Sequence, residues 1–182
     1  MSQAIGMLEM SSIARGLYTA DQMVKIAQVD VVMANATCPG KYIVIVSGDV
    51  SAVNSSVETG LQEAGEYFVD SIVIPNVTPS IFSAIVGATM PESIGAVGII
   101  ESFAISTMII VADAVLKAAN VAPLELRLGN GLGGKAYFSF TGDVSAVQIG
   151  VEVGTEIAGE KGLFVNAEVI PSPSEKLIES LL

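Results

Sequence analysis

The sequence predicts an α+β fold made of two copies of one domain in tandem. The first observation is a six-residue segment, Gly48–Val53, that recurs letter for letter as Gly142–Val147. The second is that short apolar runs of strand length alternate with segments of helical spacing. The third is that some of these strands are joined by connections too short for a parallel crossover. Together these observations predict, in each copy, a mainly antiparallel sheet with helices on one face.

The duplication extends over nearly the whole chain. Ala4–Glu9 matches Ala96–Glu101, and the later matches keep their order with only small slips in spacing, so chance is a poor explanation. Proline and glycine punctuate the segment 88–95, which marks it as a linker. We therefore predict two domains, residues 1–92 and 93–182. The other matches are Ala20, Asp21 and Lys25 with Ala112, Asp113 and Lys117; Gly40 and Lys41 with Gly134 and Lys135; Ala64–Glu66 with Ala158–Glu160; and Ile74 and Pro75 with Ile170 and Pro171.

The first copy opens with a strand and a helix. Residues 4–8 form a short apolar run that predicts a strand. Ala20, Met23, Val24 and Ala27 then recur at helical spacing. This order of elements, strand before helix, is the starting pattern of the second copy as well.

Two further strands are predicted at 29–33 and 42–46, because both segments are apolar and rich in β-branched residues. Both strands are expected to be buried. The segment between them, 34–41, contains asparagine, proline and glycine, which favour turns, so we expect a loop there.

A second helix and a last strand complete the copy. Asp49 or Ser51 is placed to cap the helix, and Gly65 is placed to end it. The strand covers 69–74 and stops at Pro75. The second copy repeats this order of elements. The apolar face of the helix consists of Val53, Val57, Leu61 and Ala64.

The composition indicates a chain that contacts copies of itself. Hydrophobic residues make up 51% of the 182 residues and charged residues only 15%, which leaves little charge to cover a surface. The net charge of −11 argues against nucleic acid and anionic membranes as partners. The apolar run 105–112 is too short to span a bilayer, and no signal-peptide pattern opens the sequence, so we expect a cytoplasmic location.

The repeated segments resemble the bacterial microcompartment shell-protein family, most of all its tandem-domain members from propanediol-utilisation shells. The resemblance is carried by Ala4–Glu9, Ala20–Lys25, Pro39–Lys41 and Gly48–Val53, each with a counterpart in the second half. It implies a homotrimer that forms a pseudohexameric disc with a central pore. It further implies a place in a microcompartment shell within the cytoplasm, with other shell proteins and enclosed enzymes as partners.

The resemblance also implies that the loop between the second and third strands of each copy lines the pore. Because the two loops differ in sequence, we expect a pore of threefold symmetry. The residues concerned are Ala36, Thr37, Cys38, Pro39 and Gly40 in the first copy, and Gly129, Asn130, Gly131, Leu132, Gly133 and Gly134 in the second.

Cys38 is the sharpest candidate for chemistry. It is the only cysteine, and the chain has no histidine, so disulfides within the chain and histidine-based catalysis or metal binding are excluded. A threefold axis would bring three Cys38 thiolates together, which suits an iron–sulfur cluster or zinc. The resemblance implies one [4Fe–4S] cluster per trimer, with a non-protein ligand on the fourth iron. Zinc, or an idle thiol, remains the alternative. Leu132, the counterpart of Cys38, has no ligating atom.

Gly129–Lys135 satisfies the spacing of two nucleotide-binding motifs, Gly-x-Gly-x-x-Gly and Gly-x4-Gly-Lys. Both motifs need a helix directly afterwards, because the helix N-terminal amides bind the phosphates. Here Ala136 replaces the Ser or Thr that would bind magnesium, and residues 137–140 have the pattern of a strand. We interpret the segment as a flexible loop.

Lys25 and Lys117 occupy equivalent helix positions. The resemblance implies that they lie at the disc edge and meet their counterparts on the next disc, whereas the plain alternative is a pair of solvated lysines. Glu9 and Glu101 occur once per copy at matching places, and we interpret them as structural rather than as a catalytic pair.

The sequence therefore favours a non-enzymatic shell protein whose pore holds a cluster that passes electrons across the shell. Two alternatives stay open: a metal-free pore for metabolites, and a nucleotide-binding enzyme that uses Gly129–Lys135.

Overall fold

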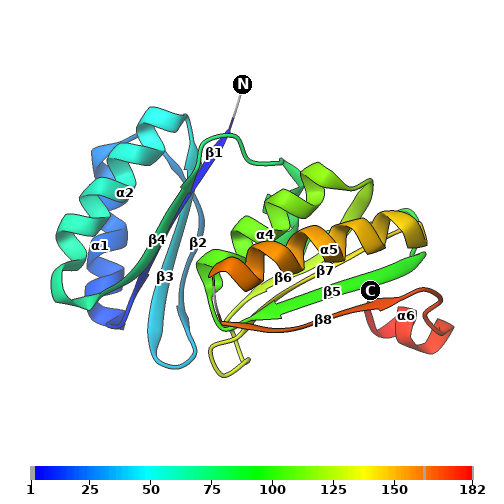
Figure 1. Cartoon of the computed structure of the whole chain (residues 1–182). Coiled ribbons are helices and arrows are strands. Elements are labelled where there is room, and N and C mark those ends of the chain that lie inside the picture. The colour runs from blue at the N-terminus through cyan, green and yellow to red at the C-terminus, as the bar shows by residue number, and fades with distance from the viewer. Residues whose placement is uncertain (1–2, 162, 182) are drawn as a thin grey trace. The chain divides into compact units, whose positions relative to one another are not determined.

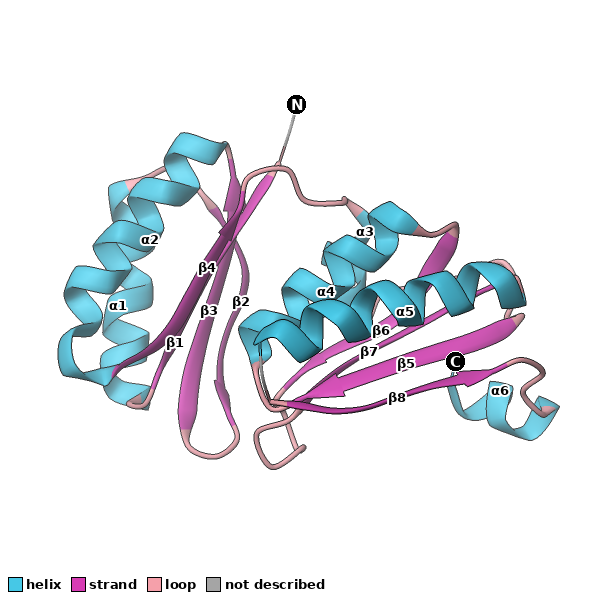
Figure 2. Cartoon of the chain, in the orientation of Figure 1, coloured by secondary structure: helices cyan, strands magenta, loops and turns pink. Residues whose placement is uncertain are grey.

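In the computed structural model, residues 3–161 and 163–181 are described. The chain divides into two compact units, Met1–Pro79 with Asn130–Gly134, and Ser80–Gly129 with Lys135–Leu182. Each unit contains a four-stranded sheet and a pair of long helices that lie on one face of that sheet (Figures 1 and 2). The predicted α+β fold, with antiparallel sheets in two copies, is confirmed.

The first unit has a sheet of strand order β2-β3-β1-β4, in which every neighbouring pair is antiparallel. The central strands are therefore β1 and β3, and β2 and β4 form the edges. The elements are β1 (Ala4–Met10), α1 (Ile13–Ile26), β2 (Asp30–Thr37), β3 (Lys41–Gly48), α2 (Val50–Ala64), a short 3₁₀ helix (Gly65–Tyr67) and β4 (Phe68–Ile74).

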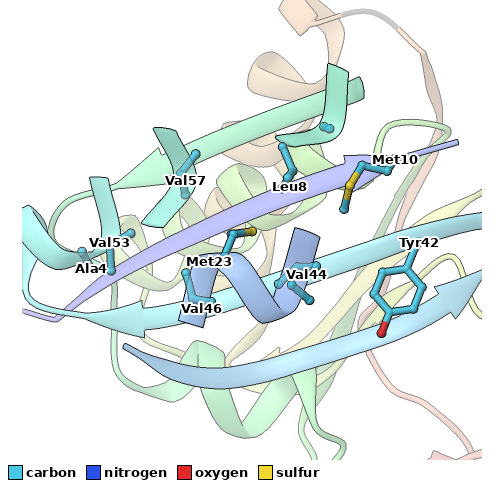
Figure 3. Close-up of a cluster of buried hydrophobic side chains, with 11 residues drawn as sticks. Ala4, Leu8, Met10, Met23, Tyr42, Val44, Val46, Val53 and Val57 are labelled. Atoms are coloured by element: carbon cyan, nitrogen blue, oxygen red, sulfur yellow. The ribbon is translucent and has the colours of Figure 1, made fainter. Parts of the chain in front are cut away.

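The core of this unit lies between the sheet and its two helices. Leu8 from β1, Val44 from β3 and Met23 from α1 are completely buried there (Figure 3). Val53 and Val57 add the contribution of α2. These positions carry the apolar spacing that predicted the helices and strands, so burial of apolar area explains why this sequence adopts these elements.

The second unit repeats the arrangement with strand order β6-β7-β5-β8. Phe138 and Phe140 of β7 are fully buried and stacked, with ring centroids 5.2 Å apart. The elements are α3 (Ser80–Ile85), β5 (Ala96–Ser102), α4 (Ile105–Ala118), β6 (Val121–Leu128), β7 (Ala136–Gly142), α5 (Val144–Lys161), β8 (Phe164–Ile170) and α6 (Glu175–Leu181).

The structure corrects the predicted loop at 34–41. Strand β2 continues to Thr37 and β3 begins at Lys41, so only Cys38–Gly40 lies outside the ladder. Asparagine and, to a lesser degree, alanine are poor strand formers, but pairing with the buried strand β3 outweighs that preference. The expectation that 29–33 is buried is also wrong, since β2 is an edge strand and Val31 is 49% exposed.

The helix boundaries are close to those expected. Asp49 is the N-terminal cap of α2, although its side chain makes no capping hydrogen bond, and Gly65 follows the last residue of that helix. The two short helices α3 and α6 were not expected, because their few residues give little periodicity to detect.

Candidate functional site: the two hairpin turns and the helix lysines

The first candidate site is the tight turn Cys38–Gly40 between β2 and β3 (Figure 1). Thr37 and Lys41 pair across the base of the turn. The backbone φ of Gly40 is +76°, a value that favours glycine, and the Cys38-Pro39 peptide bond is cis. Cys38 is a free, half-buried thiol, whereas Pro39 and Gly40 are exposed.

Two residues that were expected in this loop belong to the sheet. Ala36 pairs with Tyr42 and Thr37 pairs with Lys41, so both residues belong to the last two pairs of the β2–β3 ladder. Ala36 is exposed and Thr37 is buried. The turn that carries Cys38 is therefore short and anchored on both sides by backbone pairing.

The second candidate site is the longer connection between β6 and β7. Four of its glycines, at 129, 131, 133 and 134, have φ between +61° and +94°, a region that other residues adopt only with strain. Leu132 is half-buried and Asn130 is exposed. In the second copy, the equivalent of the Cys38 turn is thus a glycine-rich loop without a thiol.

Part of this second loop, Asn130–Gly134, clusters with the first compact unit. A Cβ placed on Gly134 would lie 3.2 Å from Cδ of Pro39 and 3.7 Å from the carbonyl oxygen of Cys38. A side chain at Gly134 would therefore meet the Cys38 turn. The two segments that the sequence assigned to one site are neighbours.

The glycine-rich segment lacks the setting of a phosphate loop. Strand β7 begins at Ala136 directly after it, as expected, so no helix N-terminus faces the loop. Lys135, the residue that would bind phosphate, instead forms an ion pair with Glu101, 2.8 Å from Nζ to Oε2.

A glutamate–lysine pair anchors the base of both turns. In the first copy Nζ of Lys41 lies 2.9 Å from Oε1 of Glu9, and only 4% of the Glu9 side chain is exposed. The Glu101–Lys135 pair repeats it, with 30% of the glutamate exposed. Each pair joins the end of the first strand of its copy, β1 or β5, to the start of β3 or to the residue just before β7. The glutamates were interpreted as structural from the sequence, but their lysine partners were not predicted, although both glutamates and both Gly-Lys dipeptides recur in the two copies.

The metal-binding capacity of a single chain is limited. Among the residues that the structure describes, no group of three or more His, Cys, Asp or Glu side chains is placed to hold a metal ion. Cys38 supplies one thiol. A multi-thiolate site at this turn therefore requires thiols from other copies of the chain.

Lys25 and Lys117 lie in the last turns of α1 and α4, where each pairs with an aspartate four residues earlier. Nζ of Lys25 is 2.5 Å from Oδ2 of Asp21, and Nζ of Lys117 is 2.6 Å from Oδ2 of Asp113. Such pairs contribute only about 0.3–0.5 kcal/mol to a helix. Their main effect is to orient the lysines, whose side chains stay 67% and 44% exposed.

Comparison with known proteins identifies the domain that occurs twice. The chain matches the family described as "BMC domain" over residues 4–77 and again over residues 96–173. It is 44% identical over 177 residues to the bacterial microcompartment shell protein PduT of Citrobacter freundii, which covers 97% of this chain and 96% of that protein. It is 27% identical to the carboxysome assembly protein CcmO of Synechococcus elongatus, over 98% of this chain and 68% of that protein.

The solved structures include a close match. A microcompartment protein from Desulfitobacterium hafniense superposes with a TM-score of 0.94 at 45% sequence identity, and the match covers 98% of this chain and 99% of that one. No helix in the described part of the chain is long and apolar enough to cross a membrane. With two matched domains that together span most of its length, the chain belongs to the BMC-domain family of microcompartment proteins.

Proposed function

We propose that this protein is a non-enzymatic structural component of a bacterial microcompartment shell inside the cytoplasm. The observation that carries the proposal is the presence of two BMC domains, at 4–77 and 96–173, in a chain that aligns over 97% of its length with a microcompartment shell protein. Two domains per chain support a trimer in which six domains form one pseudohexameric disc. Other shell proteins are its expected partners.

We further propose that three Cys38 thiolates, one from each copy, hold a [4Fe–4S] cluster on the threefold axis. The residues fit this group in two respects. Thiolate is the ligand that such clusters take, and Cys38 is a free and partly accessible thiol. When bound, the cluster would supply one-electron redox chemistry across the shell.

The chain's own residues have separate roles in this proposal. Cys38 provides the ligand, and the paired residues Thr37 and Lys41 fix the turn that presents it. Leu132 supplies no ligand in the second copy, so three ligating positions alternate with three non-ligating ones. Because the three turns offer three thiolates to a cluster of four irons, the fourth iron would need a ligand from outside these turns.

Iron content tests this part of the proposal. Protein purified and reconstituted without oxygen should contain about four irons per trimer and absorb in the visible range. Cys38→Ser should abolish both signals, whereas Leu132→Ala, the matched change in the other turn, should preserve them. A colourless wild-type trimer without iron would contradict the cluster and favour the metal-free metabolite pore.

A further inference from the structure

The connection between β6 and β7 is longer than the hairpin of this fold requires. Ala36 pairs with Tyr42 next to the turn of the first copy, and Leu128 pairs with Ala136 at the matching place in the second. The two ladders therefore end alike, yet the segment 129–135 carries more residues than its counterpart. The extra length is not needed to join the two strands.

Two neighbouring glycines of this connection differ in what surrounds them. Gly133 and Gly134 both have positive φ, +61° and +94°, so a side chain at either would strain the backbone. Apart from its chain neighbours, a Cβ on Gly133 would meet no atom of the described residues within 4 Å, whereas one on Gly134 would lie 3.2 Å from Cδ of Pro39. Gly133 is exposed and Gly134 is buried. Gly134 therefore needs its missing side chain for packing as well as for its backbone conformation.

The backbone of Gly134 packs beside the turn that carries Cys38. The same Cβ would lie 3.7 Å from the carbonyl oxygen of Cys38, so the close approach involves Cys38 as well as Pro39. These residues belong to one compact unit, because Asn130–Gly134 clusters with Met1–Pro79. A loop from the second copy of the domain thus supports a turn of the first copy.

This support acts where the sheet does not reach. The backbone pair of Thr37 and Lys41 fixes the base of the turn, and the ion pair from Lys41 to strand β1 strengthens that base. Cys38 and Pro39 lie beyond the ladder. The contact with Gly134 therefore holds the part of the turn that carries the thiol.

We propose that Gly134 is a positioning residue for the Cys38 thiol, because its bare backbone packs against Cys38 and Pro39 and fixes how the turn presents the sulfur. The consequence for a cluster rests on the proposed function. A methyl group at position 134 would displace Pro39 by a few tenths of an ångström, and ligands need to be held within roughly 0.5 Å of their working geometry. The second copy thereby takes part in a site whose thiols all come from the first.

The plain alternative is that the glycines serve only to let the connection turn. In that case Gly133 and Gly134 would be equally sensitive to a side chain, because both have positive φ. The positioning role predicts unequal effects, since the contact with the Cys38 turn exists at Gly134 and not at Gly133.

The test compares Gly134→Ala with Gly133→Ala in the full chain, first without metal. Cys38 is the only thiol of the sequence, so its rate of reaction with iodoacetamide reports on this turn alone. Gly134→Ala should raise the rate about tenfold, which corresponds to about 1.4 kcal/mol, a typical effect of overpacking. Gly133→Ala should keep the rate within about twofold of the wild type.

A second variant separates the contact from backbone strain. Asparagine tolerates positive φ better than alanine but still carries a Cβ. Gly134→Asn should therefore raise the alkylation rate as Gly134→Ala does, with less loss of stability. Circular dichroism checks that all three variants are folded.

The reconstituted cluster provides a readout that a loss of stability alone would not move. Gly134→Ala should release iron to EDTA about tenfold faster than the wild type, as changes next to metal ligands do. It should also shift the midpoint potential and the electron paramagnetic resonance spectrum of the reduced cluster, because both respond to the surroundings of the sulfurs. Gly133→Ala should leave the potential and the spectrum unchanged.

The outcomes separate this inference from the proposed function. Equal alkylation rates in the wild type and both Gly134 variants would overturn the positioning role, and so would equal increases for Gly133→Ala and Gly134→Ala. A wild-type chain that binds no iron would overturn the cluster, and the alkylation rates of the metal-free chain would then decide the role of Gly134 by themselves.

Discussion

The glutamate–lysine pairs differ in burial between the copies, and this difference should be measurable. Glu9 is almost fully enclosed, whereas Glu101 is 30% exposed and better hydrated. Glu9→Gln removes the charge opposite Lys41 and should lower the free energy of unfolding by about 1–3 kcal/mol. Glu101→Gln should lower it by no more than about 1 kcal/mol. Urea unfolding at one fixed chain concentration compares the two variants. Equal losses of unfolding free energy would show that burial of the glutamate does not determine how much each ion pair stabilises the fold.

The raised pKa of Tyr137 predicts a loss of stability in alkali. The neutral hydroxyl is favoured in the folded chain by burial and by its bond to Glu125, while the unfolded chain ionises near pH 10. Stability from this group is therefore complete below pH 10 and declines as the pH rises beyond it. Tyr137→Phe should make the unfolding free energy less dependent on pH in that range. Urea titrations at pH 9 and pH 11 test this. An equal change in unfolding free energy between the two pH values for the wild-type chain and for Tyr137→Phe would refute it.

At the residue scale the sequence predicted where chemistry can occur but not how the residues are held. Cys38 and Leu132 were identified as the point of divergence, because the duplication aligned them. The Glu9–Lys41 pair was missed because its members are thirty-two residues apart, and only the strand register brings them together.

The hydrophobic spacing predicted the helix faces only in part, since Met23 is buried whereas Val24 and Leu61 are 39% and 38% exposed. Met23 is completely buried between α1 and the sheet, close to α2 (Figure 3). Met23→Ala should therefore cost about 2–5 kcal/mol of unfolding free energy. Val24→Ala, one residue away but 39% exposed, should change it by no more than about 0.5 kcal/mol. Thermal unfolding of both variants supplies the comparison, and a small effect at Met23 would contradict the assigned core.

The bounds of a strand were predictable where its apolar run coincides with the segment that the fold buries. Strands β1 and β3 are buried along nearly their whole length, and their apolar runs predicted them. Strand β2 was predicted too short, because an edge strand carries exposed alanine and asparagine that look like a loop. The extra helices α3 and α6 follow proline-containing segments and are too short for periodicity to reveal them.

At the scale of the whole molecule, the proposed position of Lys25 and Lys117 at the disc edge predicts that both lysines contribute to the tiling of discs. Lys25 and Lys117 are oriented by Asp21 and Asp113 and remain accessible. The double change Lys25→Ala with Lys117→Ala should preserve discs but reduce their assembly into sheets in negative-stain electron microscopy. Lys161→Ala, an exposed lysine at the end of α5, serves as the control. Sheets of unchanged extent would remove these lysines from the edge contact.

The tandem architecture was predictable from the sequence alone, because the duplication is visible as matching segments in the two halves, such as Gly48–Val53 and Gly142–Val147. The assembly was not predictable from a single chain in the same way. Its contacts form between chains, so neither the repeats nor the exposure of side chains within one chain define them.

Covalent fusion of the two copies has a consequence for how the turns can evolve. In a ring of separate identical domains, any change in a turn appears six times, and a mixture of two different domains would assemble in random proportions. Here the three-residue turn Cys38–Gly40 and the glycine-rich segment Gly129–Lys135 are made in equal numbers, and in the proposed disc they would alternate in a fixed order. One turn is therefore free to acquire a ligand while the other keeps the backbone freedom that lets Gly134 lie against it.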